Sequence, residues 1–222
     1  MALKGASPAA TPCPFDGDRR PHAPRVLALD TRLPHAATPA QERDHARALA
    51  RAALTRALAV HLGCAPQALS VSEVRGTPPR LAWTAGDAAA LDAIGLSISH
   101  APGLSLAAWS PQGAVGVDVQ AVPRTAGRAE LWRTAALFFG KNQLETLDRQ
   151  ALTAPFFEVF AHHWAAHEAA LKCARLALAE YSPAVATRLA GMRVVTLGLP
   201  AWASAGVVAA LAYRPLGDST PR

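Results

Sequence analysis

The side chains best suited to chemistry begin with an acidic residue inside a strand-like run, residues 115 to 120. Valines alternate there with Gly116, Asp118 and Gln120, and this two-residue period is typical of a strand with one buried face. Asp118 and Gln120 therefore point to the same side, about 7 Å apart. Because aspartate is depleted in strands and a buried carboxylate is costly unless it is paired or binds a metal, we interpret Asp118 as a candidate functional residue.

A hydroxyl and an imidazole stand a short distance before this run. Ser99 and His100 end another strand-like segment and precede the turn signal Ala-Pro-Gly at residues 101 to 103. Side chains at the end of a strand are well placed to bind a ligand. The alternative is an ordinary hairpin with a capping serine and an exposed histidine.

A third set lies on a helix that we predict for residues 156 to 179. Trp164, Glu168 and Lys172 are four residues apart, so they share one side of this helix. A glutamate followed by a lysine at i+4 forms an ordinary surface ion pair. A glutamate beside a tryptophan on a mostly apolar helix indicates instead a carboxylate at the edge of the core, and the sequence leaves both interpretations open.

Two histidines on the same helix suggest a competing metal site. His163 and His167 have the i, i+4 spacing of a zinc pair. No third ligand follows in a local pattern, and the glutamate is misplaced for a His-Glu-x-x-His motif. We therefore favour ordinary buried or exposed histidines over a zinc site.

A basic helix precedes all of these residues. Residues 40 to 63 form a helical pattern that ends at Gly63. Arg43, Arg47 and Arg51 recur on it every four residues, and leucines continue the same side of the helix. This face is either a solvated basic stripe or a surface that binds an anion.

The remaining pattern mixes strands and helices. A first strand is predicted at residues 25 to 30. Further strands are predicted at residues 68 to 75, 189 to 199 and 205 to 213, and further helices at residues 130 to 139 and 143 to 149.

The composition is that of a folded protein with an anionic partner. Of 222 residues, 51% are hydrophobic and 17% are charged, which is enough apolar surface for a substantial core. The formal net charge of +6 favours a phosphorylated ligand, an acidic protein, nucleic acid or a membrane surface as the partner. The sequence contains no recognisable nucleic-acid-binding motif and no apolar run long enough to span a bilayer, so we expect neither nucleic acid nor membrane.

Cysteine usage favours the cytoplasm. Cys13, Cys64 and Cys173 lie far apart and form no Cys-x-x-Cys pair, so a disulfide-built secreted fold is not expected. The N-terminus lacks the hydrophobic segment of a secretory signal. We expect a cytoplasmic protein in which Cys173 is a small core residue of its helix rather than a nucleophile.

Taken in order, these motifs resemble a known family. The sequence reads Ser-x-Ser-His at residues 97 to 100, Gly-Val-Asp-Val at 116 to 119 and Trp-x-x-x-Glu-Ala-x-x-Lys at 164 to 172. This ordered set resembles the 4′-phosphopantetheinyl transferases of the surfactin-synthetase-activating (Sfp) type. Residues 76 to 78, Gly-Thr-Pro, stand where the family has Gly-Lys-Pro, and residues 138 to 144 resemble its Phe-Phe-x-x-x-Glu segment.

The resemblance covers roughly residues 25 to 213. It implies an α/β (α+β) fold of two similar subdomains related by pseudo-twofold symmetry, each a small sheet packed on a long helix. Such a chain makes its own cleft, so a monomer is expected. The corresponding division of the chain is a flexible leader at residues 1 to 24, an N-terminal half at 25 to 110, a C-terminal half with the metal-binding residues at 111 to 214, and a tail at 215 to 222.

The activity that the resemblance implies is that of a holo-[acyl-carrier-protein] synthase. Such enzymes use Mg²⁺ and transfer the 4′-phosphopantetheine arm of coenzyme A to a serine of an apo acyl or peptidyl carrier protein. These carriers serve fatty-acid, polyketide and nonribosomal peptide synthesis. By the same resemblance Mg²⁺ would be held by Asp118, Glu168 and Gln120, Glu168 would also take the serine proton, and Lys172 would stabilise charge on the diphosphate. Coenzyme A would be bound by Arg43, Arg47, Arg75, Arg80, Ser99 and His100.

Three positions depart from the family pattern. Gln120 replaces a glutamate, Thr77 replaces the lysine of Gly-Lys-Pro, and His167 replaces a lysine just before Glu168. An amide adds no negative charge to a metal site, and two positive charges on the phosphate side are lost. The alternative function is therefore a catalytically weakened homologue that binds coenzyme A or a carrier protein without turnover.

Overall fold

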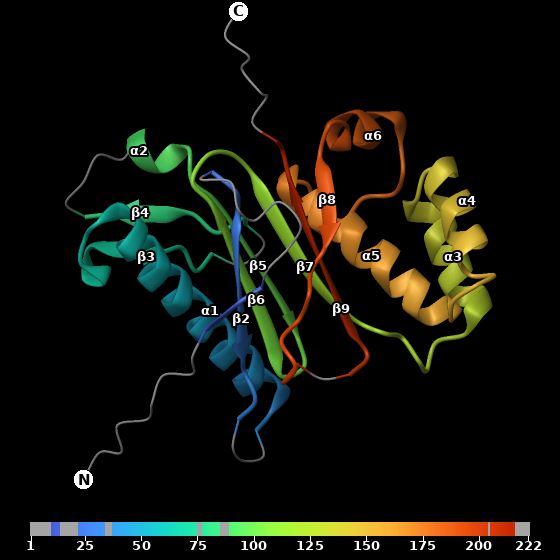
Figure 1. Cartoon of the computed structure of the whole chain (residues 1–222), viewed down its shortest axis with the longest axis horizontal. Helices are drawn as coiled ribbons and strands as arrows, with labels where there is room; N and C mark the ends of the chain where they lie inside the picture. The colour runs from blue at the N-terminus through green and yellow to red at the C-terminus, as the bar shows by residue number, and fades with distance from the viewer. Residues whose placement is uncertain are drawn as a thin grey trace, which may run out of the picture.

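Two antiparallel sheets share a core at the centre of the molecule, and each carries a long helix on its other face (Figure 1). The structure is a computed structural model that describes residues 10–13, 22–33, 37–74, 77–84, 89–203 and 205–215. It is a mixed α+β fold, which confirms the predicted fold class.

The first sheet has the strand order β1-β2-β6-β5, and α1 (Pro39–Leu62) covers one of its faces. Its strands are β1 (Thr11–Pro12), β2 (Arg25–Asp30), β5 (Gly95–Ala101) and β6 (Leu104–Ser110). In β2, Leu27 and Leu29 pack toward α1, whereas Val26 and Ala28 enter the core shared by both sheets. The two-residue period predicted for a strand thus supplies both faces of this sheet.

Both ends of α1 are fixed by residues that suit them. Thr38 and Gln41 form a reciprocal capping box at its start, and Gly63 adopts a left-handed φ of 65° at its end. The helix predicted at residues 40 to 63 is confirmed.

The second sheet has the order β7-β9-β8 and is covered by α5 (Phe156–Cys173). Its strands are β7 (Val115–Ala121), β8 (Arg193–Thr196) and β9 (Val207–Tyr213). The valines of β7 enter the shared core. Gly116, on the other face, lets α5 approach closely, because a Cβ atom there would lie 2.0 Å from the carbonyl oxygen of Ala169.

The two halves of the chain have the same topology. Apart from β1 and the smaller elements described below, each runs strand, long helix, strand, strand, and in each the first of these strands pairs with the last: β2 with β6, and β7 with β9. The remaining strand, β5 in the first sheet and β8 in the second, pairs with the other edge of that last strand. This shared topology is what a pseudo-twofold relation between the halves requires.

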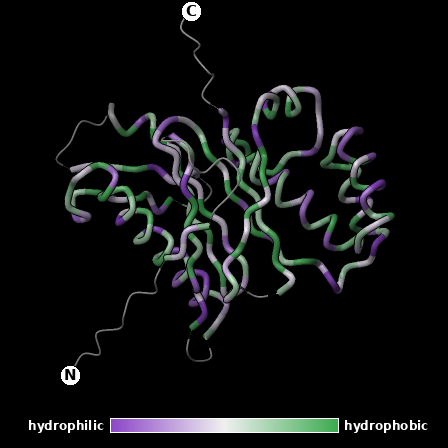
Figure 2. Tube along the Cα trace, in the orientation of Figure 1, coloured by the Kyte–Doolittle hydropathy of each residue, from purple (hydrophilic) through white to green (hydrophobic). Residues whose placement is uncertain are grey.

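Smaller elements flank the two sheets. Near α1 lie the 3-10 turn η1 (Pro66–Ala68), the hairpin of β3 (Leu69–Val71) and β4 (Leu81–Trp83), and α2 (Ala89–Asp92). In the C-terminal half, α3 (Arg128–Phe138) and α4 (Lys141–Gln150) pack on α5 through aromatic side chains, and α6 (Pro183–Leu189) precedes β8. Figure 2 shows that the central strands are mostly hydrophobic, whereas α3 and α4 alternate hydrophobic and hydrophilic residues.

Several boundaries differ from the prediction, and the strand expected at residues 68 to 75 spans only Leu69–Val71. Within the expected flexible leader, Thr11–Pro12 pair with β2. Cys13 is buried, and its amide donates to the carbonyl of Val26. The helix predicted to reach residue 179 ends at Cys173. The strand predicted from residue 189 begins at Arg193, because Ser182 caps a helix that runs to Leu189.

Candidate functional site

The site lies where the two sheets meet. There β5, an edge strand of the first sheet, lies beside β7, an edge strand of the second. Backbone N–H groups of β7 donate there to serine side chains of β5: Val117 to Oγ of Ser97 at 3.0 Å and Val119 to Oγ of Ser99 at 3.2 Å. Hydroxyls therefore replace the carbonyl acceptors of a regular ladder. This line of contact between the halves, the β5–β7 seam, places Ser99 beside Asp118.

A buried ion pair crosses from β7 to α5 at this seam. Asp118 is only 2% exposed, and its Oδ1 lies 2.6 Å from Nζ of Lys172 and 2.7 Å from Oγ of Ser99. Lys172 also donates to Oγ of Ser99 at 3.1 Å and to the carbonyl of Val117 at 3.3 Å. All three ammonium hydrogens of Lys172 are thus used within the protein.

The hydroxyl of Ser99 is equally occupied. It donates to Asp118 and accepts from Lys172 and from the amide of Val119, which is the full capacity of a hydroxyl. Ser99 was expected to hold phosphates of coenzyme A. In the structure it fixes the positions of Asp118 and Lys172, and its contact with coenzyme A stays a prediction.

Glu168 lies next to this pair and is half-buried. Burial and the neighbouring negative charge of Asp118 raise the pKa of Glu168, while the positive charge of Lys172 and a hydrogen bond from Trp164 oppose that rise. Of the two interpretations that the sequence left open, the structure supports a carboxylate at the edge of the core, because Lys172 makes its ion pair with Asp118.

Two observations test whether a divalent cation fits between these carboxylates. In the ionised form of the site Oδ2 of Asp118 is buried with no hydrogen-bond donor among the described residues, and the ionised form of Glu168 is destabilised by the close approach and the charge of Asp118. A bound cation would relieve both. The described residues contain no group of three or more His, Cys, Asp or Glu side chains placed for a metal, so water and phosphate oxygens would complete the shell, as Mg²⁺ favours.

Gln120 lies on the same face of β7 as Asp118 but is turned to a different partner. Its amide nitrogen donates to the carbonyl of Ala121 at 3.2 Å, and the side chain is partly exposed. Its expected role as a metal ligand stays a prediction.

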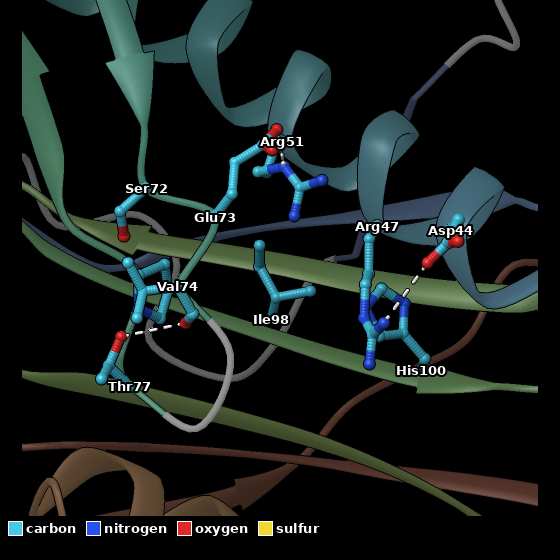
Figure 3. A pocket seen from close by; sticks show the side chains of 10 residues that line it. Asp44, Arg47, Arg51, Ser72, Glu73, Val74, Thr77, Ile98 and His100 are labelled. Atoms are coloured by element: carbon cyan, nitrogen blue, oxygen red, sulfur yellow. Dashed lines mark hydrogen bonds and ion pairs between the residues drawn. The ribbon is translucent and has the colours of Figure 1, made fainter.

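A cavity of about 480 Å³ opens between α1, β5 and the segment after β3 (Figure 3). Arg47, Arg51 and His100 line it, together with Thr77 on the opposite wall. Asp44 pairs with Arg47 at 3.5 Å and Glu73 pairs with Arg51 at 3.2 Å. These carboxylates hold the guanidinium groups at the cavity wall, as Figure 3 shows.

His100 is kept neutral in this cationic setting. Its Nδ1 lies 2.7 Å from Oγ of Ser105, which fixes the ring. Burial of the ring, followed by the charges of Arg47, Lys172 and Arg51, lowers the pKa of His100 to about 4. An anion bound beside it would oppose that shift.

A second cavity of about 260 Å³ adjoins the first on the side of the ion pair. The two share Thr77, Pro79 and Ile98 in their walls, and the second is lined by Lys172 and Arg175. We call the two adjoining cavities together the cationic cleft. It has Arg47, Arg51 and His100 at one end and Lys172 and Arg175 at the other.

Not every predicted binding residue reaches this cleft. Arg43 and Arg80 are exposed and do not line either cavity, and Arg75 lies outside the described residues. Arg51, which the sequence places on the basic face of its helix with Arg43 and Arg47, was not among the expected coenzyme A contacts, but it lines the cleft. Arg175 was missed, and no sequence pattern marks it.

His163 and His167, which have the spacing of a zinc pair, each contact other parts of the protein. His163 pairs with the side chain of Gln150 at 2.9 Å. His167 is buried with its ring 5.4 Å from that of Phe139, and burial lowers its pKa. His167 therefore brings no positive charge to the cleft.

The remaining expectations concern the cysteines and the membrane. Burial raises the pKa of Cys13 to about 11 and also raises that of Cys173, so both are inert core thiols. Across the described residues, the helices are too short or too polar to cross a bilayer.

No protein-family model matches the chain, and a search of curated proteins finds no match.

Proposed function

We propose that this protein is a Mg²⁺-dependent 4′-phosphopantetheinyl transferase that acts on an apo acyl or peptidyl carrier protein. The observation that carries the proposal is the convergence of Asp118, Glu168 and Lys172, the last of which lines one end of the cationic cleft. Two carboxylates and a cation beside a cleft with further cations suit the transfer of a phosphoryl-linked group.

Coenzyme A fits the charge distribution of the cleft. It carries a diphosphate and, on its ribose, a separate 3′-phosphate. Arg47 and Arg51 would bind the 3′-phosphate, since guanidinium groups suit bidentate phosphate contacts. The diphosphate would then lie toward Lys172, beside the carboxylates.

Mg²⁺ bound by Asp118 and Glu168 would neutralise the diphosphate and polarise it for displacement. The oxygen of the carrier serine forms a bond to the phosphorus next to the pantetheine arm. The bond from that phosphorus to the bridging oxygen breaks, and adenosine 3′,5′-bisphosphate leaves. Glu168 accepts the serine proton as the general base. Lys172 contributes its positive charge beside the reacting phosphorus.

The acceptor would be a protein with an acidic surface around its serine. The net charge of +6 supports such a partner, because opposite charges speed association.

Intact-mass spectrometry tests the proposal. An apo acyl carrier protein and an apo peptidyl carrier domain are each incubated with the protein, coenzyme A and Mg²⁺. We expect a mass gain of one phosphopantetheine arm on at least one carrier, and no gain with Glu168→Gln. Binding of coenzyme A without any gain on a panel of carriers would favour the alternative, a relative that binds without turnover.

A further inference from the structure

The last turn of α5 ends in an unusual backbone conformation at Arg175. Its φ is 56°, and it is the sole non-glycine residue with positive φ among the described residues. Glycine is the usual residue at this position after a helix. The amide of Leu176 donates to the carbonyl of Leu171 at 2.9 Å, which closes the helix in the way that requires the left-handed residue.

The position of the Arg175 side chain explains why an arginine stands here in place of glycine. Arg175 lines the cationic cleft together with Lys172 and Leu176. Strained backbone conformations concentrate at functional sites, where the side chain that they place has a role.

Arg175 also differs from the other cations of the cleft in having no hydrogen-bond or ion-pair partner in the part of the chain that the structure describes. Arg47 and Arg51 are paired with carboxylates, and Lys172 uses all three of its hydrogens on Asp118, Ser99 and Val117. Within the described residues, the guanidinium of Arg175 makes no hydrogen bond or ion pair. Its five donors are therefore available to a ligand.

We propose that Arg175 binds the diphosphate of the ligand, taking over the direct contacts that the occupied ammonium of Lys172 does not make. The proposal rests on the proposed function and adds a binding residue to it. Lys172 and Arg175 lie at the same end of the cleft, away from Arg47 and Arg51. This placement assigns Arg175 to the diphosphate rather than to the 3′-phosphate.

Isothermal titration of coenzyme A and of dephospho-coenzyme A, which keeps the diphosphate but lacks the 3′-phosphate, separates the two contacts. We expect Arg175→Gly to weaken both ligands by about tenfold, which is typical of one lost charge-assisted hydrogen-bonding contact. Arg175→Lys should recover part of this affinity. Arg51→Gln should weaken coenzyme A and leave dephospho-coenzyme A nearly unchanged.

Two controls exclude other causes. Arg175→Gly should raise the melting temperature, because glycine accepts positive φ without strain, so lost affinity cannot come from unfolding. Arg133→Gln removes the same charge from the exposed side of α3 and should leave both affinities unchanged.

Unchanged affinity of Arg175→Gly for both ligands would overturn the proposal, as would a loss confined to coenzyme A. If the unmodified protein binds neither ligand, the proposed function fails, and pyrophosphate with Mg²⁺ becomes the probe for Arg175. The proposal then requires that Arg175→Gly weaken pyrophosphate binding by about tenfold. Absence of that effect, or of pyrophosphate binding, would overturn it.

Discussion

The ammonium of Lys172 lies 2.6 Å from Oδ1 of Asp118, a residue 54 positions earlier in the chain. The pair ties the long helix of the C-terminal half to the strand that meets the N-terminal half. Because Asp118 is almost completely buried, its charge depends on Lys172 and Ser99 for stabilisation.

Removing the charge of Lys172 should therefore destabilise the fold as well as the site. We expect Lys172→Met to lower the free energy of unfolding by roughly 3 kcal/mol, the low end of the range for a broken buried pair because the lysine is one-third exposed. Urea unfolding measures the change. The double variant Asp118→Asn, Lys172→Met should regain part of the stability and none of the transferase activity. A single variant as stable as the unmodified protein would contradict the assigned pair.

Glu168 should make stability depend on pH and on Mg²⁺. The pKa of Glu168 is raised in the folded state, so protonated Glu168 contributes to the stability of the fold. This contribution to stability is lost as the pH rises through the folded-state pKa. We expect Glu168→Gln to raise the melting temperature by a few degrees at pH 8 and to change it less at pH 4. Mg²⁺ should stabilise the unmodified protein more than the variant. Equal stabilisation of both by Mg²⁺ would argue against Glu168 as a ligand.

His100 should couple anion binding to proton uptake. Its pKa of about 4 in the free protein would rise beside a bound phosphate, so the complex takes up a proton at pH values between the two pKa values. Coenzyme A should then bind more tightly as the pH falls through this window. Titration calorimetry in buffers of different ionisation enthalpy measures the proton count, and His100→Gln should reduce it. An unchanged count in the variant would place His100 away from the phosphates.

Gly116 should be needed for the approach of α5 to β7. A Cβ atom at this position would lie 2.0 Å from the carbonyl oxygen of Ala169 and 2.5 Å from the amide nitrogen of Cys173, so the helix would have to move. We expect Gly116→Ala to cost about 1–3 kcal/mol of stability and to reduce carrier modification, because Lys172 moves with the helix. Gly127→Ala is the control, since its Cβ meets no atom within 4 Å and the change should cost less.

Local patterns in the sequence predicted much of the scaffold. The alternation in β7 placed its valines in one core and Asp118 on the opposite face, and the four-residue spacing of Trp164, Glu168 and Lys172 placed them together. These predictions succeeded because strand and helix periods follow from backbone geometry alone.

Contacts between distant segments could not be predicted in this way. The pairing of Lys172 with Asp118 rather than Glu168 depends on how closely α5 lies on β7. The burial of His167 depends on Phe139, which comes from the segment before α4. Arg175 enters the cleft because the helix ends earlier than its alanine-rich sequence indicates.

The β5–β7 seam has a consequence for local motion. The amides of Val117 and Val119 are held by serine hydroxyls, whose rotation can release them without separating two backbones. Ser99 is itself held by Asp118 and Lys172, so a ligand that draws on either residue alters the restraint on this hydroxyl. The hydrogen-exchange rates of these two amides should therefore change when a ligand occupies the cleft. Exchange at the boundary between the two halves would then report binding directly.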